Sequence, residues 1–253
     1  MTSLTEDRAH HLLLVQPHVY FRTLGGFDVF VDEQPAIWTM QGIGTPQMRL
    51  PLGYLIARRD QPICRDILIE IARRRSENPP RYVVSALLRL LTRWDMAPAL
   101  VIDDTSIMLR CHPVWGTDTD TLQRLWHTAN ALQANGEQLQ ALAALQQAKQ
   151  LCGGAYMPFY DALPEYAITG EVDFWQEMQK NVLLELAELH LALTRPYPCA
   201  EALRVTGRAV EIDRWNPATC IAAAAIARRC GNEVRARFYE KKAKGHDDPP
   251  SKN

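Results

Sequence analysis

The stretch NPPRYVVSALLRLLTRW, residues 78–94, decides how the first half of the chain is interpreted. It predicts a helix that begins after two prolines, because proline fits the first turn of a helix better than its interior. At about 100° per residue, the apolar side chains fall on one side of this helix and must be buried. These apolar residues are Val83, Val84, Leu87, Leu88, Leu90, Leu91 and Trp94.

The opposite side of the same helix covers an arc of about 140° and contains no carboxylate. Arginine binds guanine edges and phosphates, and hydroxyl groups bind phosphate oxygens, so this composition favours DNA binding. An ordinary solvent-facing helix usually mixes positive and negative charges, whereas this one has Arg89 at the middle of an uncharged or basic arc. The arc holds Arg81, Tyr82, Ser85, Ala86, Arg89, Thr92 and Arg93.

Arginine is concentrated around this helix. Ten arginines and four acidic residues lie between Gln47 and Arg93, and no lysine precedes Lys149. Arg73, Arg74 and Arg75 end the preceding predicted helix, where they are either charges that complement the helix dipole or phosphate contacts flanking the groove. A solvated surface whose arginine content follows genome composition is the alternative interpretation. The formal net charge of −1 for the whole chain argues against a general polyanion-binding protein.

The elements on either side of the helix complete a recognisable order. Residues 20–38 predict two strands around a Gly25-Gly26 turn, and residues 48–59 and 64–75 predict two helices, the first with Pro51 in its opening turn. Residues 99–113 predict a hairpin that turns at residues 103–106. This order is that of a winged helix-turn-helix, in which the third helix enters the major groove and the hairpin is the wing. Arg110, at the end of the wing, is a candidate phosphate contact.

Beyond Asp118 the chain is rich in alanine, leucine and glutamine and shows long helical periodicity. Small residues recur at equal offsets in three places, and the last two copies start 34 residues apart, which is the tetratricopeptide period. The first two copies start 61 residues apart, separated by the insertion CGGAYMPFYDALPEY at 152–166. Tetratricopeptide-like helix pairs are therefore predicted, with generic alanine-rich antiparallel helices as the alternative. The three copies are Gly136, Ala141, Ala148; Tyr197, Ala202, Ala209; and Gly231, Ala236, Ala243.

These patterns predict a mostly α-helical chain with small β elements. We expect a flexible N-terminal segment at 1–19, a winged helix-turn-helix DNA-binding domain at 20–116, a tetratricopeptide-like domain at 117–245 and a disordered tail at 246–253. Neither a signal peptide nor an apolar run of transmembrane length is seen, and none of the six cysteines form a CxxC pair. We therefore expect a cytoplasmic protein whose cysteines are reduced thiols in apolar positions.

No sequence motif favours an enzyme. The chain has neither a glycine-rich phosphate loop nor a GxSxG motif, so no catalytic residue, cofactor or metal site is predicted. Glu185, Glu188 and His190 lie together on one predicted helix but lack the HExxH spacing of a zinc site. We interpret them as solvated positions on an amphipathic helix.

Five stretches follow one another in a fixed order: residues 21–38, 52–71, YVVSALLRLL at 82–91, GTDTDTLQRLWHTA at 116–129 and LCGGAYMP at 151–158. In that order they resemble the Streptomyces antibiotic regulatory protein family and its wider bacterial relatives. The resemblance covers roughly residues 20 to 244. It implies a response-regulator-type winged helix joined to a bacterial transcriptional activator domain of tetratricopeptide type, sequence-specific binding to double-stranded DNA near a promoter, and recruitment of RNA polymerase.

The chain departs from this family where DNA and polymerase contacts are expected. Basic residues commonly follow the serine that Ser85 matches, whereas Ala86 and Leu88 stand here and Arg89 alone keeps the charge. A tryptophan usually ends the second helix, where this chain has Arg73, and the loop RRRSENPP in the polymerase-contacting region is short.

Two functions therefore compete. The first is a DNA-binding transcription regulator that self-associates through its helical domain, which also contacts polymerase or an effector. The alternative is an interaction adaptor or signal-sensing module whose winged helix no longer binds DNA. The candidate DNA-binding residues are Arg73, Arg74, Arg75, Arg81, Tyr82, Ser85, Arg89, Thr92, Arg93 and Arg110.

Overall fold

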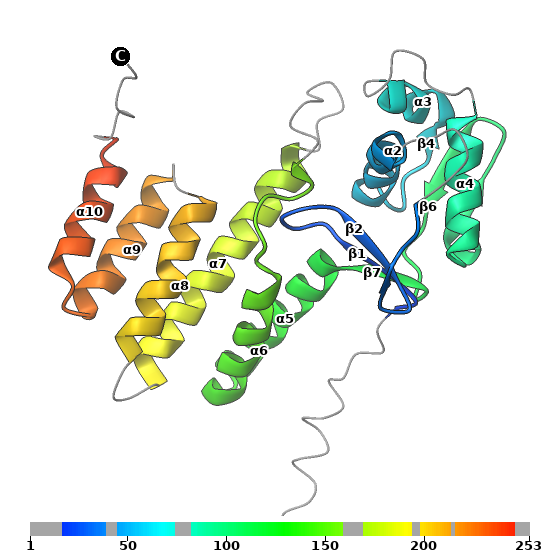
Figure 1. Cartoon of the computed structure of the whole chain (residues 1–253). Helices are drawn as coiled ribbons and strands as arrows, with labels where there is room; N and C mark the ends of the chain where they lie inside the picture. Colours follow the sequence, from blue (N-terminus) through cyan, green and yellow to red (C-terminus); the bar gives the residue numbers. More distant parts are fainter. Residues whose placement is uncertain are drawn as a thin grey trace, which may run out of the picture. The chain divides into compact units, whose positions relative to one another are not determined.

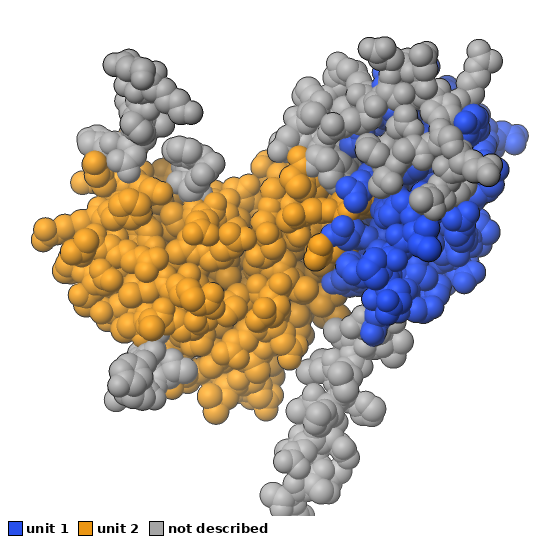
Figure 2. All heavy atoms as spheres, in the orientation of Figure 1, with its two compact units in different colours: residues 1–21, 28–117 blue, residues 22–27, 118–253 orange. Residues whose placement is uncertain are grey.

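A computed structural model describes residues 17–38, 45–73, 82–158, 169–193, 198–213 and 216–245. The chain divides into two compact units (Figure 2). Unit 1 comprises residues 1–21 and 28–117, and unit 2 comprises residues 22–27 and 118–253. Within the described residues, small β elements and three helices make unit 1, and helices make most of unit 2, so the predicted fold class is confirmed.

A four-stranded sheet opens unit 1. It contains β1 (Val19–Arg22), β2 (Asp28–Val31), β3 (Gln34–Pro35) and β7 (Trp115–Thr117) in the order β3-β2-β1-β7. The predicted pair β1 and β2 is present, whereas β3 and β7 were not predicted. β7 runs parallel to β1, and the ring of its Trp115 packs edge-on against Phe21 with centroids 5.7 Å apart. The start and the end of unit 1 are thereby held in one sheet.

The remainder of unit 1 is a winged helix-turn-helix (Figure 1). Its helices are α2 (Thr45–Ala57), α3 (Arg65–Arg73) and α4 (Val83–Arg93). The predicted hairpin consists of β5 (Leu100–Ile102) and β6 (Ser106–Leu109), and β4 (Ile63–Cys64) pairs with the other edge of β6. The predicted order of three helices and a wing is therefore confirmed, and the short β4 is an addition.

The position of Pro51 differs from the prediction. Helix α2 begins at Thr45, so Pro51 lies inside the helix and not in its opening turn. An interior proline removes one backbone hydrogen-bond donor and bends the helix. Pro46 lies in the first turn of α2, where proline is favoured. The prediction began the helix at Met48 because the apolar periodicity begins there.

In the described part of unit 2, six helices follow the segment 22–27. They are α5 (Asp118–Ala134), α6 (Gln138–Leu151), α7 (Thr169–Leu193), α8 (Pro198–Ile212), α9 (Pro217–Arg229) and α10 (Glu233–Ala243), and they lie side by side in chain order (Figure 1). We describe them as three pairs, α5 with α6, α7 with α8 and α9 with α10. No helix of the described segments is long and apolar enough to cross a membrane.

The repeated small residues lie where the helices meet. Ala141, Ala148, Ala202, Ala209 and Ala236 are completely buried, and Ala243 is partly buried. Gly136 and Gly231 occupy equivalent turns within the first and third pairs, with φ of 79° and 70°, a conformation that glycine adopts readily. The predicted tetratricopeptide-like helix pairs are therefore confirmed at these positions, and Tyr197 of the second copy lies outside the described residues.

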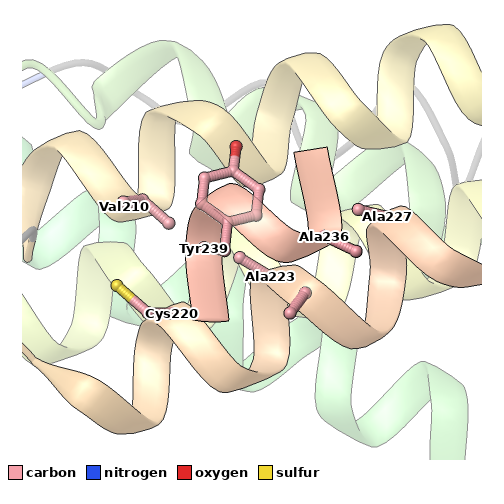
Figure 3. Close-up of a cluster of buried hydrophobic side chains, with 7 residues drawn as sticks. Val210, Cys220, Ala223, Ala227, Ala236 and Tyr239 are labelled. Carbon is pink, nitrogen blue, oxygen red and sulfur yellow. The ribbon is translucent and has the colours of Figure 1, made fainter. Parts of the chain in front are cut away.

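Figure 3 shows why small side chains are needed at the end of the repeat. Ala223 and Ala227 of α9 and Ala236 of α10 bring the two helices close together, and Tyr239 fills the remaining space beside Val210 of α8. A larger residue at any of these alanines would force the helices apart, because buried cores are packed to crystal-like density.

A buried network holds residues 22–27 to the helices of unit 2, and we call it the clasp: residues 22–27, Asp118 and residues 153–157. The carboxylate of Asp118 accepts hydrogen bonds from the Thr23 and Leu24 backbone N–H groups, and Leu24 pairs with Tyr156 in a β-bridge. Gly25 has φ of 77°, and a Cβ there would lie 2.6 Å from the Gly153 carbonyl oxygen. Three of the five stretches that carry the family resemblance thus meet at one place.

Candidate nucleic-acid interface

Helix α4 is strongly amphipathic in the structure. Its apolar residues pack against α2 and α3, and Trp94 at its end contacts Trp38 edge-on with ring centroids 5.2 Å apart. This packing fixes which side of the helix remains accessible. The buried residues are Val83, Val84, Ala86, Leu87, Leu90, Leu91 and Trp94.

The accessible side of α4 presents most of the predicted set. Tyr82, Ser85, Arg89, Thr92 and Arg93 are all exposed. The exposed fraction of Tyr82 reaches 47 %. No carboxylate interrupts this side of the helix between residues 82 and 93. The structure therefore brings five predicted residues onto one surface.

Ala86 does not belong to the accessible side of α4, contrary to the prediction. It was placed at the edge of the polar side, but its exposed fraction is 1 %. The packing of α4 against two helices covers more of its circumference than the apolar residues alone indicate. Ala86 directly follows Ser85, at a position where the resembling proteins commonly have a basic residue, and it is buried here. The nearest exposed cation after Ser85 is Arg89.

Internal contacts hold Thr92 on this surface and Arg73 before it. The Thr92 hydroxyl donates to the Leu88 carbonyl oxygen at 2.9 Å, one turn earlier in the same helix. Arg73, at the end of α3, forms a 3.2 Å ion pair with Glu70. Both groups would exchange these contacts for phosphate, which reduces the net gain on binding. Arg74, Arg75 and Arg81 lie outside the described residues.

The wing has acidic residues in its turn and an arginine, Arg110, at its other end. Asp103 in the turn accepts from the Thr105 N–H at 2.8 Å and from the Ser106 hydroxyl at 2.7 Å. The hydrogen bonds from Ser106 and Thr105 lower the pKa of Asp103 to about 2, so the carboxylate is ionised at neutral pH. Arg110, at the other end of β6, is exposed, while its backbone N–H donates to the Ala99 carbonyl oxygen at 2.8 Å. Arg65 donates to the Asp103 carbonyl oxygen at 2.5 Å, so a cation also lies beside the turn, and Asp60 is close enough to Arg110 to interact with its charge.

Glu185, Glu188 and His190 of α7 were expected to be solvated, and the structure contradicts this for two of the three. His190 is buried, and Glu185 is half-buried and accepts a hydrogen bond from the Trp126 indole at 3.1 Å. Burial raises the pKa of Glu185 and lowers the pKa of His190. Glu188 alone is exposed, and it pairs with Arg229 of α9. Helix α7 packs against α6 on one side and α8 on the other, which covers the positions of Glu185 and His190.

The cysteines are free thiols, as predicted, but they do not all lie in apolar positions. Cys152 and Cys220 are buried, whereas Cys64 and Cys111 are exposed in unit 1. Burial raises the pKa of Cys152 to about 12, so this thiol stays protonated at neutral pH.

Sequence reasoning missed a group of cations in unit 2. Lys149, Arg204, Arg208 and Arg235 line one pocket, although they come from three helices and share no offset in the repeat. No spacing in the sequence could have indicated this group, because the helical packing alone brings it together.

No family model matches this sequence, and no curated protein matches it. The chain does match a solved structure, Mycobacterium tuberculosis EmbR in complex with a low affinity phosphopeptide, with 17 % sequence identity and a TM-score of 0.68. The match covers 91 % of this chain and 60 % of the EmbR chain, so this chain spans less than two thirds of EmbR. The chain therefore shares a fold with EmbR along nearly its whole length, from the small β elements and winged helix to the helical repeats.

Proposed function

We propose that this protein is a DNA-binding transcription regulator that places α4 in the major groove. The observation that carries the proposal is the accessible side of α4: Arg89 and Arg93 lie exposed beside Ser85 and Tyr82, with no carboxylate among them. This side belongs to the third helix of a winged helix-turn-helix, which is the reading element of that motif. The fold shared with EmbR supports the same class of regulatory protein.

Each exposed group has a distinct role in the proposal. Arg89, at the centre of the helix, donates to a guanine edge, because a guanidinium can bond O6 and N7 together. Ser85 and Tyr82 donate to phosphate oxygens beside the groove, and Arg93 and Arg110 contact the backbone on either flank. Arg73, Arg74, Arg75 and Arg81 add phosphate contacts before the helix, and Thr92 contributes after releasing its internal hydrogen bond.

Unit 2 supplies self-association and contact with RNA polymerase in this proposal. Large apolar side chains are exposed on its last two helices: Ile221 at 60 %, Val234 at 83 % and Phe238 at 49 %. Exposed apolar residues on neighbouring helices favour association with a second surface. The regulator would act in the cytoplasm without catalysis, metal or cofactor.

The test is enrichment of genomic DNA fragments on the full chain at a series of salt concentrations. A regulator of this kind should select a small set of sequences, and its affinity should fall steeply as salt rises because bound phosphates release counterions. Fragments recovered without sequence preference at every salt concentration would contradict sequence-specific recognition.

A second candidate function is an adaptor whose winged helix binds protein. The ionised Asp103 at the wing tip, next to the exposed Asp104, favours this candidate because it repels a phosphate backbone. Failure of the full chain to retain any DNA fragment at low salt would support it.

A further inference from the structure

Unit 2 contains a pocket that the proposed DNA recognition does not use. It encloses about 550 Å³, within the range of roughly 300–1,000 Å³ that ligand sites occupy. Its lining comes mainly from the second helix of each pair, α6, α8 and α10, and Leu183 of α7 contributes to the wall. A ligand in this pocket would therefore contact all three helix pairs.

The lining of the pocket is positively charged. Lys149 of α6, Arg204 and Arg208 of α8 and Arg235 of α10 all line it, and Glu211 is the acidic residue among the lining side chains. The pocket lining therefore has more positive charge than the chain as a whole, whose formal net charge is −1. Cations that share one pocket repel one another unless anions compensate them.

The neighbouring acids compensate the pocket incompletely. Glu201 accepts from the Lys149 ammonium at 2.9 Å and from the Arg204 guanidinium at 2.6 Å. The hydrogen bonds from Arg204 lower the pKa of Glu201 to about 2, so it is ionised at neutral pH. Glu211 pairs with Arg208 at 3.1 Å. Two carboxylates thus meet four cations, and an excess of positive charge remains for a ligand.

Arg235 is held in place without a carboxylate. Its guanidinium lies 5.7 Å from the centroid of the Tyr239 ring, and its Nε donates to the Tyr239 hydroxyl at 3.0 Å. Within the described part of the chain, no carboxylate forms an ion pair with it. Gly207 leaves room for the guanidinium, since a Cβ there would lie 2.7 Å from the terminal nitrogen. A pre-positioned guanidinium loses little freedom when it binds an anion.

We propose that this pocket binds an acidic peptide segment of a partner protein. Its cations are distributed over three helices, which suits several carboxylates along an extended chain better than one small anion. Leu183, Val205 and Ala200 also line the pocket, and Ala200 is the exposed residue of the three. The proposal rests on unit 2 alone and requires no DNA.

The test uses the full chain and a fluorescein-labelled peptide of five glutamate-leucine repeats, measured by fluorescence anisotropy without DNA. A second peptide carries glutamine at every glutamate position. We expect saturable binding of the acidic peptide and none of the glutamine peptide. The Arg208→Gln/Arg235→Gln variant should bind the acidic peptide about ten-fold or more weakly, because each charge-assisted hydrogen bond to a carboxylate contributes strongly to affinity.

A matched variant separates site binding from general charge attraction. Arg124→Gln/Arg237→Gln removes the same charge from exposed positions of α5 and α10 that do not line the pocket, and it should bind as the parent does. Circular dichroism melting of each variant confirms that the helices remain folded. Equal loss in both double variants, undiminished binding in both, equal binding of the glutamine peptide, or no saturable binding of the acidic peptide would each overturn the proposal. Displacement of the peptide by inorganic phosphate at equal concentration would show a free-anion site and overturn the peptide assignment.

Discussion

The carboxylate of Asp118 binds both the backbone and the side chain of Thr23, accepting from its N–H at 2.9 Å and from its hydroxyl at 2.6 Å. Both residues are buried, although 95 positions separate them in the sequence. Asp118 also begins α5, where a negative charge is favoured by the helix dipole. Burial raises the pKa of Asp118, and the hydrogen bonds from Thr23 oppose that shift. This contact closes the clasp.

Replacing the carboxylate should therefore destabilise unit 2. Asp118→Ala leaves the Thr23 and Leu24 N–H groups buried without their acceptor, and each unsatisfied group costs about 1–3 kcal/mol. Urea denaturation followed by circular dichroism measures the loss. Asp173→Ala removes an exposed carboxylate from α7 and should change the free energy of unfolding by less than about 0.5 kcal/mol. Equal stability of the two variants would show that the clasp contributes nothing.

The contribution of His190 to the stability of the fold should fall as pH drops below neutrality. Burial holds the pKa of His190 below its ordinary value of 6.5, so below pH 6.5 the unfolded chain binds a proton that the folded chain does not. Stability from this residue is therefore complete above pH 6.5 and is lost as pH falls toward the lower folded-state pKa. His190→Gln should flatten the pH dependence of the urea midpoint between neutral and mildly acidic pH. His127→Gln, which removes an exposed histidine from α5, should preserve it. The prediction fails when both variants keep the parent slope.

Loss of the central arginine should weaken recognition without weakening the fold. Arg89→Ala is expected to reduce affinity for a selected DNA site by about 1–3 kcal/mol, the contribution of a two-point guanine contact. Arg89 is exposed, so the melting temperature should stay nearly constant. Anisotropy titrations with the full chain provide the measurement, and Arg124→Ala on α5 is the control. Unchanged affinity of the Arg89 variant would contradict its role.

The arginines before the α4 helix should act on affinity and not on sequence choice. Replacing Arg73, Arg74 and Arg75 together with alanine should lower the slope of log affinity against log salt by about 1 for each phosphate that the protein no longer neutralises. The ranking of preferred sequences should stay the same. An unchanged slope would identify these residues as helix-end charges.

The sequence predicted the parts of the fold that repeat or alternate over many residues. The apolar side of α4 and the alanines of the repeat have enough periodicity to indicate which residues are buried. The strands β3, β4 and β7 have two or three residues each, too few for a pattern. Ala86 was misplaced because an alanine carries no preference strong enough to locate an interface. The clasp and the cationic pocket form where segments that are distant in the sequence meet. The spacing of residues within one segment cannot predict such contacts.

Recognition of DNA in this proposal depends most on Arg89 of α4 reading the major groove. The most direct measurement compares the parent and Arg89→Ala full chains on a selected duplex in which single guanines are replaced by 7-deazaguanine, which lacks the N7 acceptor. We predict that one substitution weakens the parent by about ten-fold or more and leaves the Arg89 variant unaffected, because the same contact has already been removed. Equal losses in the two proteins at every guanine would contradict recognition of the major groove by Arg89.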